Sequence, residues 1–111
     1  MPRTETLVPT DRPARYGKQL VAHLGRRAGG EWDEQAGRGW IEFAAGRAEV
    51  EATADGLRMT VDGDDLDQLE DVVGRHLVRF GTRDELHVRW VRADGSAGTE
   101  QQAPAEDAQA E

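Results

Sequence analysis

Two histidines with similar local sequences are the residues whose type and spacing best suit chemistry. His23 begins the run His23-Leu24-Gly25-Arg26, and His76 begins the run His76-Leu77-Val78-Arg79. An imidazole binds iron or zinc and exchanges protons near neutral pH. Counted at about 100° per residue, His76 lies about 45° from the centre of its helix's apolar stripe, and His23 about 100° from its own. If the two helices are neighbours, the imidazoles are predicted to meet at the seam between them.

A nearby carboxylate would complete a set of two histidines and one carboxylate, the arrangement suited to iron or zinc. Glu70 and Glu31 are the candidates for that third ligand. The alternative is a pair of hydrogen-bonded histidines with only a structural role. Because no close-spaced pair such as His-x-x-x-His occurs, the spacing of His23 and His76 leaves both interpretations open.

Basic residues on the same two helices suggest an anion site beside the histidines. Arg79 and Arg83 surround the exit of the second helix, and Arg15 and Lys18 lie on the first. Helix capping and solvated ion pairs are the alternative explanation for these charges. The predicted ligand-binding residues are Arg15, Lys18, His23, His76, Arg79 and Arg83, with His23 and His76 as the metal ligands.

Trp40 is a candidate of another kind, since it lies on the predicted wet face of a sheet among mixed charges. An exposed tryptophan anchors partners or ligands effectively. Cross-strand ion pairs beside a partly shielded Trp40 would give the same pattern without any partner. Trp40 is therefore the predicted interaction residue, and a homodimer is a possible partner state.

Several chemistries are excluded by composition. Cysteine is absent and Ser96 is the sole serine, in the presumed tail, which excludes serine and cysteine hydrolases. A Gly-x-Gly-x-x-Gly or phosphate-binding loop is also missing, so no nucleotide cofactor is predicted and the cofactor stays unknown. The net charge is −8, with no basic block, which argues against nucleic acid as a partner.

The elements that position these residues follow from the hydropathy period. A helix is predicted from about Pro13 to Gly25, with Tyr16, Leu20 and Leu24 on one face. Between residues 31 and 61 the period changes to 2, which predicts a four-strand antiparallel meander. A second helix is predicted to open within the acidic stretch 62–67 and to end near Phe80.

A short first strand near residues 5–8 and a closing strand near 86–91 complete the order β-α-β-β-β-β-α-β. The predicted fold class is α+β, a two-layer sandwich with both helices on one face of a mostly antiparallel sheet. Residues 1–92 are predicted to form this single domain. Residues 93–111, with five acids and no base, are predicted to be a disordered acidic tail.

No apolar run reaches the length of a membrane span or a signal peptide, so no membrane partner is predicted. A small core without cysteine suits the reducing cytoplasm, which is the predicted location.

Three stretches carry a resemblance to a known family: Arg15-Tyr16-x-Lys18-Gln19-Leu20-x-x-His23, Gly39-x-Ile41-x-Phe43, and Leu69-Glu70-x-Val72-Val73-x-x-His76-Leu77-x-Arg79-Phe80-x-x-Arg83-Asp84-Glu85-Leu86-x-Val88-x-Trp90. They resemble the bacterial family catalogued as domain of unknown function 2218. The resemblance implies a TATA-binding-protein-like or phosphohexomutase-C-terminal-like fold and a loose link to iron and siderophore uptake. It assigns no activity. Gly17 departs from the family pattern, which has a larger apolar residue there, at a cost of about 1 kcal/mol in helix propensity.

Three hypotheses follow for function. The first is a non-enzymatic accessory protein that holds a small ligand or metal ion at the helix seam, in iron handling. The second is an interaction or dimerisation module that acts through the sheet face at Trp40. The third is an enzyme with His76 as a general base, which requires a His76 that solvent can reach.

Overall fold

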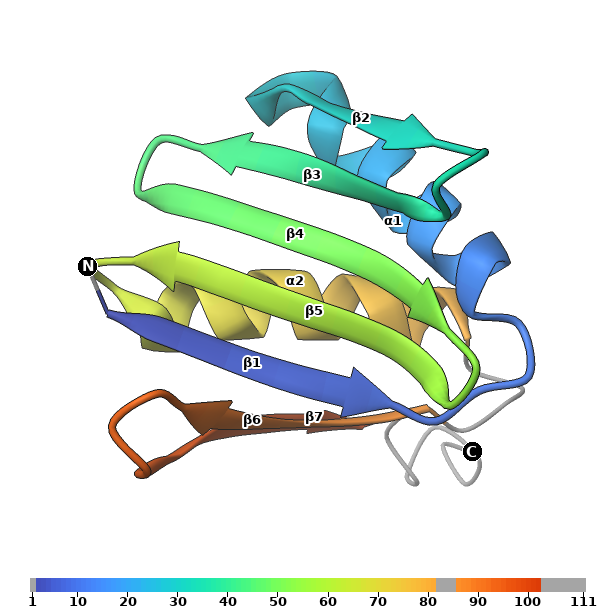
Figure 1. Ribbon diagram of the computed structural model, residues 1–111. Coiled ribbons are helices and arrows are strands. Elements are labelled where there is room, and N and C mark those ends of the chain that lie inside the picture. Colours follow the sequence, from blue (N-terminus) through green and yellow to red (C-terminus); the bar gives the residue numbers. More distant parts are fainter. Residues whose placement is uncertain (1, 82–85, 103–111) are drawn as a thin grey trace, which may run out of the picture.

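One antiparallel sheet carries both helices on a single face in the computed structural model (Figure 1), which describes residues 2–81 and 86–102. In chain order the elements are β1 (Arg3–Val8), α1 (Pro13–Ala28), β2 (Gly30–Asp33), β3 (Arg38–Phe43), β4 (Gly46–Thr53), β5 (Gly56–Gly63), α2 (Leu66–Phe80), β6 (His87–Arg92) and β7 (Ala97–Gln102). The strands lie in the order β2-β3-β4-β5-β1-β6-β7. The predicted α+β class, with two helices on one face, is confirmed.

Strict alternation along the strands divides the sheet into a covered and an open face. Strand β1, for example, alternates exposed and buried residues through its whole length. The buried set of β1, β4 and β5 lies under the helices, whereas their charged residues face outward. The β2–β5 meander that the period of 2 predicted is therefore present, with the register that places its apolar side chains, apart from Trp40, on the covered side.

Helix α1 lies on the strands at the β2 end of the sheet, where one of its glycines packs against an aromatic ring of β2. Tyr16, Leu20 and Val21 of α1 are buried in the core. Gly17 lies under the indole of Trp32, close enough that a Cβ there would come within 2.8 Å of the ring. The residue at which the chain departs from the family pattern thus makes room for a side chain on β2.

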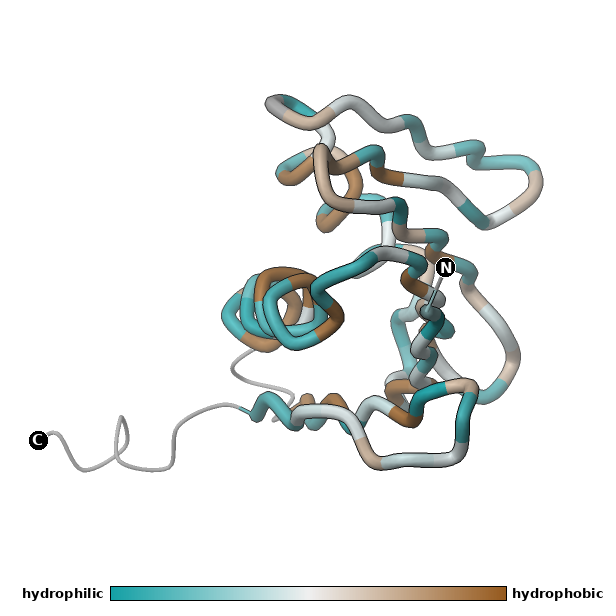
Figure 2. Tube along the Cα trace, turned by 90° about the vertical axis from the view of Figure 1, so that its left-hand side faces the viewer, coloured by the Kyte–Doolittle hydropathy of each residue, from teal (hydrophilic) through white to brown (hydrophobic). Residues whose placement is uncertain are grey.

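Helix α2 lies over the other half of the sheet. Its buried stripe includes Leu69, Val73 and Leu77, and Asp65 caps its first turn by accepting a hydrogen bond from the Gln68 N–H. In the side view of Figure 2, α2 is seen nearly end-on beside the layer of strands. Figure 1 shows the β6–β7 hairpin almost edge-on, because the sheet curls around this helix.

The structure differs from the predicted tail at residues 97–102, which form β7 and pair with β6. The segment has no apolar alternation, so its hydropathy gave no strand signal. It is held instead by polar contacts: Gln101 accepts a hydrogen bond from the buried Trp90 Nε1–H at 2.7 Å, and Thr99 donates to Glu70. The rest of the predicted tail, residues 103–111, lies outside the described part of the chain.

Neither helix within residues 2–81 and 86–102 is both long and apolar enough to cross a lipid bilayer.

Candidate functional site

The two histidines meet at the seam between the helices. His23 of α1 and His76 of α2 have ring centroids 5.2 Å apart, with the rings tilted by 40°. Phe80, one turn after His76, packs edge-on against His23 at 5.4 Å. We call His23, His76 and Phe80 the seam site. The predicted meeting of the imidazoles is confirmed. Phe80 is not among the predicted residues of this site, although residues four apart on a helix are neighbours and its position after His76 is a usable signal.

The two imidazoles of the seam site differ in exposure, as their positions on the helices predicted. His23 is exposed, and His76 is half-buried, so solvent still reaches it. The Nδ1 of His76 lies 2.7 Å from the carbonyl oxygen of Val72, one turn earlier in α2. A carbonyl oxygen only accepts hydrogen bonds, so Nδ1 carries the hydrogen and Nε2 keeps its lone pair in the neutral ring. Such a backbone contact commonly fixes a metal-binding histidine in the tautomer that ligates through the other nitrogen.

The two carboxylates predicted as the third metal ligand do not lie beside His23 and His76. Glu70 is fully buried and bound by Arg92 and Thr99 rather than by a histidine. Glu31 lies opposite Trp40 in the β2–β3 register, where it lines a hollow on the open face of the sheet. Among residues 2–81 and 86–102 no cluster of three metal-ligating side chains occurs, so the two-histidine-one-carboxylate prediction is wrong for this part of the chain.

Glu70 forms a buried ionic network that joins α2 to the β6–β7 hairpin. Arg92 of β6 donates to its two carboxylate oxygens at 3.2 and 3.1 Å, and the backbone N–H of Thr99 donates at 2.9 Å. Burial by itself raises the pKa of Glu70, but the bonds from Arg92 and Thr99 outweigh it, and the pKa lies below the usual carboxyl range. Its location and partners make this a structural network, and the sequence signal for it was one acid in an apolar helix stripe.

The predicted anion-binding cations Arg15 and Lys18 of α1 are not positioned to share a site with the histidines. Lys18 forms an ion pair with Glu34, and Arg15 is exposed on α1, eight residues before His23. Arg79 is exposed on α2 and is not without an interaction partner. Arg83 lies outside the described residues. The structure therefore brings together His23 and His76 from the predicted ligand set, whereas Lys18 is engaged elsewhere by Glu34.

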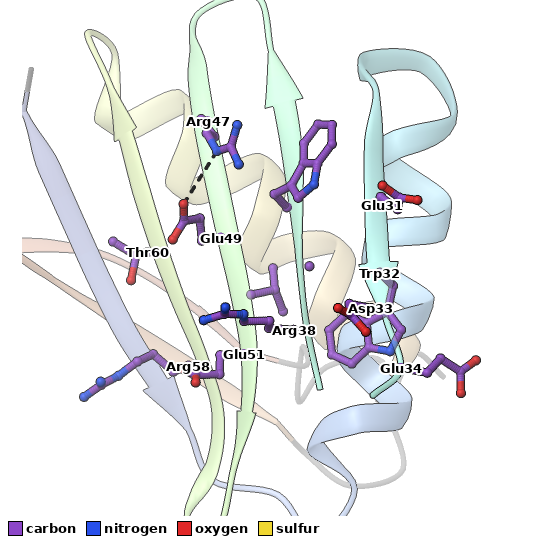
Figure 3. Close-up of a pocket in the computed structure, with 13 residues that line it drawn as sticks. Glu31, Trp32, Asp33, Glu34, Arg38, Arg47, Glu49, Glu51, Arg58 and Thr60 are labelled. Atoms are coloured by element: carbon purple, nitrogen blue, oxygen red, sulfur yellow. Dashed lines mark ion pairs between the residues drawn. The ribbon is translucent and has the colours of Figure 1, made fainter. Parts of the chain in front are cut away.

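The open face of the sheet carries a second candidate site, a hollow of about 710 Å³ over β2 to β5 (Figure 3). Trp40 stands at this hollow, and the guanidinium carbon of Arg47 lies 4.9 Å from the centre of its ring. Arg47 also pairs with Glu49 at 3.6 Å, the dashed line in Figure 3. The third histidine, His87 of β6, does not belong to the seam site. It pairs with Glu100 of β7 at 3.2 Å.

Comparison with known proteins gives a family and a fold but no activity. Residues 5–91 match the family model described as an uncharacterized protein conserved in bacteria, DUF2218. The solved NMR structure of the Pseudomonas aeruginosa protein PA4090 is similar, with 31% sequence identity, a TM-score of 0.64, and coverage of 81% of this chain and 95% of that chain. A search of the curated proteins found no match. The resemblance stated from three sequence stretches is thus confirmed.

Proposed function

The chain belongs to the uncharacterised bacterial family DUF2218, and from that premise we propose that it is a non-enzymatic accessory protein that binds a transition-metal ion, or a small metal-bound ligand, at the seam site. One observation carries the proposal. Imidazoles from two helices, far apart in sequence, lie with ring centroids 5.2 Å apart, one of them oriented by a backbone carbonyl.

The spacing of the rings suits one shared ion. Zinc binds histidine nitrogen at about 2.0–2.1 Å with tetrahedral angles, which separates the centres of two bound imidazole rings by about 5 Å. The distance of 5.2 Å between the ring centroids of His23 and His76 agrees with that separation. Neutral imidazole prefers zinc, iron, copper and nickel over magnesium or calcium, so the class of ion is a first-row transition metal.

Iron handling in the cytoplasm is the setting that we propose for this site. Imidazole is a ligand of iron as well as of zinc. The absence of cysteine suits a reducing compartment. The exposure of His23 leaves the site open to a ligand that arrives with its own metal ion.

Calorimetric titration of the full chain with Zn²⁺ and with Fe²⁺ under anaerobic conditions tests the proposal. We expect binding by the wild type, and a loss of affinity of at least about tenfold in His23→Ala and in His76→Gln, since each removes one imidazole ligand. His87→Ala is the matched control, because His87 is exposed on the other face and should leave binding unchanged. Folding of each variant is checked by NMR.

Two results of that titration would contradict the proposal. One is the absence of heat and of shifts in the imidazole NMR signals with either metal. The other is equal loss of affinity in His87→Ala and His23→Ala, which would assign the binding to histidines in general.

A second candidate function is dimerisation of two copies through the open sheet face. The observation in its favour is the hollow beside Trp40, whose ring is half-buried and has Arg47 over it. Aromatic and arginine side chains are enriched at interface centres.

Light scattering coupled to size exclusion, in metal-free buffer, tests this second candidate. If the open face forms a dimer, wild-type chain is dimeric and Trp40→Ala is monomeric with almost unchanged thermal stability. A metal-free monomer at high protein concentration rules the open-face dimer out.

A further inference from the structure

We propose that a second copy of this chain completes the seam site, so that one metal ion is bound by four imidazoles, His23 and His76 from each of two chains. This inference rests on the metal-binding function proposed above. It adds the number of ligands, their source and the assembly that follows from them.

The seam site supplies only part of the ligand set that a zinc ion requires. A stable zinc site in a protein takes four ligands. The seam site supplies two, and residues 2–81 and 86–102 hold no third histidine, cysteine or carboxylate in the same cluster. His23 is exposed, so a bound ion at the seam would present its remaining coordination positions outward. An outward-facing, half-complete set is the arrangement that a symmetric partner completes.

The arrangement of the helices allows that symmetry. Figure 1 shows both helices on the same face of the sheet, with α1 inclined to α2, and the two imidazoles meet where the helices approach each other. A two-fold axis that passes through this meeting point, in the plane of contact, brings the helix faces of two chains together. Residues on the axis then face their own counterparts, which brings the two seam sites together in an isologous interface.

The charges of the two helices favour the same pairing. In a chain with a net charge of −8, α1 has four basic residues and no acid. Arg15 and Arg26 are exposed on α1, whereas Lys18 pairs with Glu34. The segment 64–80, which includes α2, has five acids and two arginines, but Glu70 is buried and bound by Arg92, and Asp71 pairs with Arg75. Its exposed acids are Asp64, Asp65 and Asp67, at the start of α2. Contact between α1 of one chain and the start of α2 of the other would bring opposite charges together, which favours and steers association.

The open face of the sheet does not combine a pair of neighbouring histidines with exposed basic residues as the helix face does. Several of its arginines already pair with acids of neighbouring strands, as Arg3 does with Asp62 at 2.7 Å and Arg58 with Glu5 at 3.4 Å. Its histidine, His87, pairs with Glu100. Metal-dependent assembly is therefore assigned to the helix face.

Native mass spectrometry and light scattering of the full chain, with and without Zn²⁺, test the proposal. We expect a monomer in metal-free buffer and, with zinc, a dimer that retains one ion per two chains. His23→Ala should remain monomeric with zinc, since the exposed imidazole is removed and the fold is not. His87→Ala is the control and should dimerise as the wild type does.

Each other outcome contradicts the proposal in a distinguishable way. One zinc ion per monomer overturns the shared site and leaves the metal-binding function standing. No retained zinc overturns both. A dimer that forms without metal and persists in His23→Ala overturns the shared site, and sensitivity of that dimer to Trp40→Ala would assign it to the open face.

Discussion

Gly17 leaves room for the Trp32 ring, and this contact gives the departure from the family pattern a physical reason. A Cβ at Gly17 would lie 2.8 Å from two atoms of the Trp32 ring and 3.1 Å from Leu57. Contacts this short require the neighbours to move, and the indole is rigid. Glycine is therefore required by packing here, although it costs about 1 kcal/mol in helix propensity.

Gly17→Ala is expected to lower the free energy of unfolding by about 1–3 kcal/mol, because overpacking outweighs the gain in helix propensity. In a Trp32→Leu background the same substitution should instead be neutral or stabilising, since the ring is gone. Urea unfolding of the four proteins in this cycle gives the coupling. Equal effects of Gly17→Ala in both backgrounds would contradict the contact.

Glu70 is expected to make the stability of the fold depend on pH. Its pKa is lowered in the folded chain, so the unfolded chain binds the proton more readily. The carboxylate thus contributes stability at neutral pH, and this contribution is lost as the pH falls through the lowered folded pKa.

The variant Glu70→Gln should be destabilised near neutral pH by about 1–3 kcal/mol, since Arg92 loses a charged partner. Its stability should also fall less steeply than that of the wild type below about pH 4.5. Unfolding by urea across this range measures both effects. Glu51→Gln, at an exposed position of β4, is the control, and a slope equal to that of Glu70→Gln would refute the assignment.

At the scale of elements, β7 exists because its partners are already in place on other elements. Gln101 is buried and accepts the Trp90 Nε1–H bond, and it lies against Gly74 of α2, where a Cβ would come within 2.0 Å of its side chain. Gly74 thus allows the strand to approach the helix. The hairpin, α2 and the buried carboxylate of Glu70 form one connected unit.

We expect Gln101→Ala to lower the free energy of unfolding by about 1–3 kcal/mol, because it leaves the buried Trp90 N–H without its acceptor. Hydrogen exchange should quicken first in β6 and β7. Gln102→Ala, one residue away and exposed, is the matched control and should change little. Similar losses in the two variants would contradict the role of the buried amide.

At the scale of the whole molecule, the uneven charge matters more than its total. The chain is acidic overall, yet α1 is basic on its exposed face. If two chains meet through their helix faces, the association should weaken as salt is raised, since exposed charges are screened beyond about 10 Å at 0.1 M ionic strength.

The double variant Arg15→Glu with Arg26→Glu should shift the zinc-linked dimer toward monomer. Arg58→Glu makes the same kind of charge change on the open face and serves as the control. Sedimentation at low and high salt measures the shift. A dimer unaffected by the helix variant but broken by Arg58→Glu would place the interface on the sheet.

The sequence by itself determined the α+β class, the two helices, the meander and the different exposure of His23 and His76, because all of these follow from local periodicity. Tertiary structure alone decided that Glu70 binds Arg92 rather than a histidine, that residues 97–102 form a strand, and that the imidazoles lie 5.2 Å apart. Each of these depends on contacts between residues remote in the chain. Hydropathy along one segment carries no information about the partner that a polar side chain meets when the sheet curls around α2.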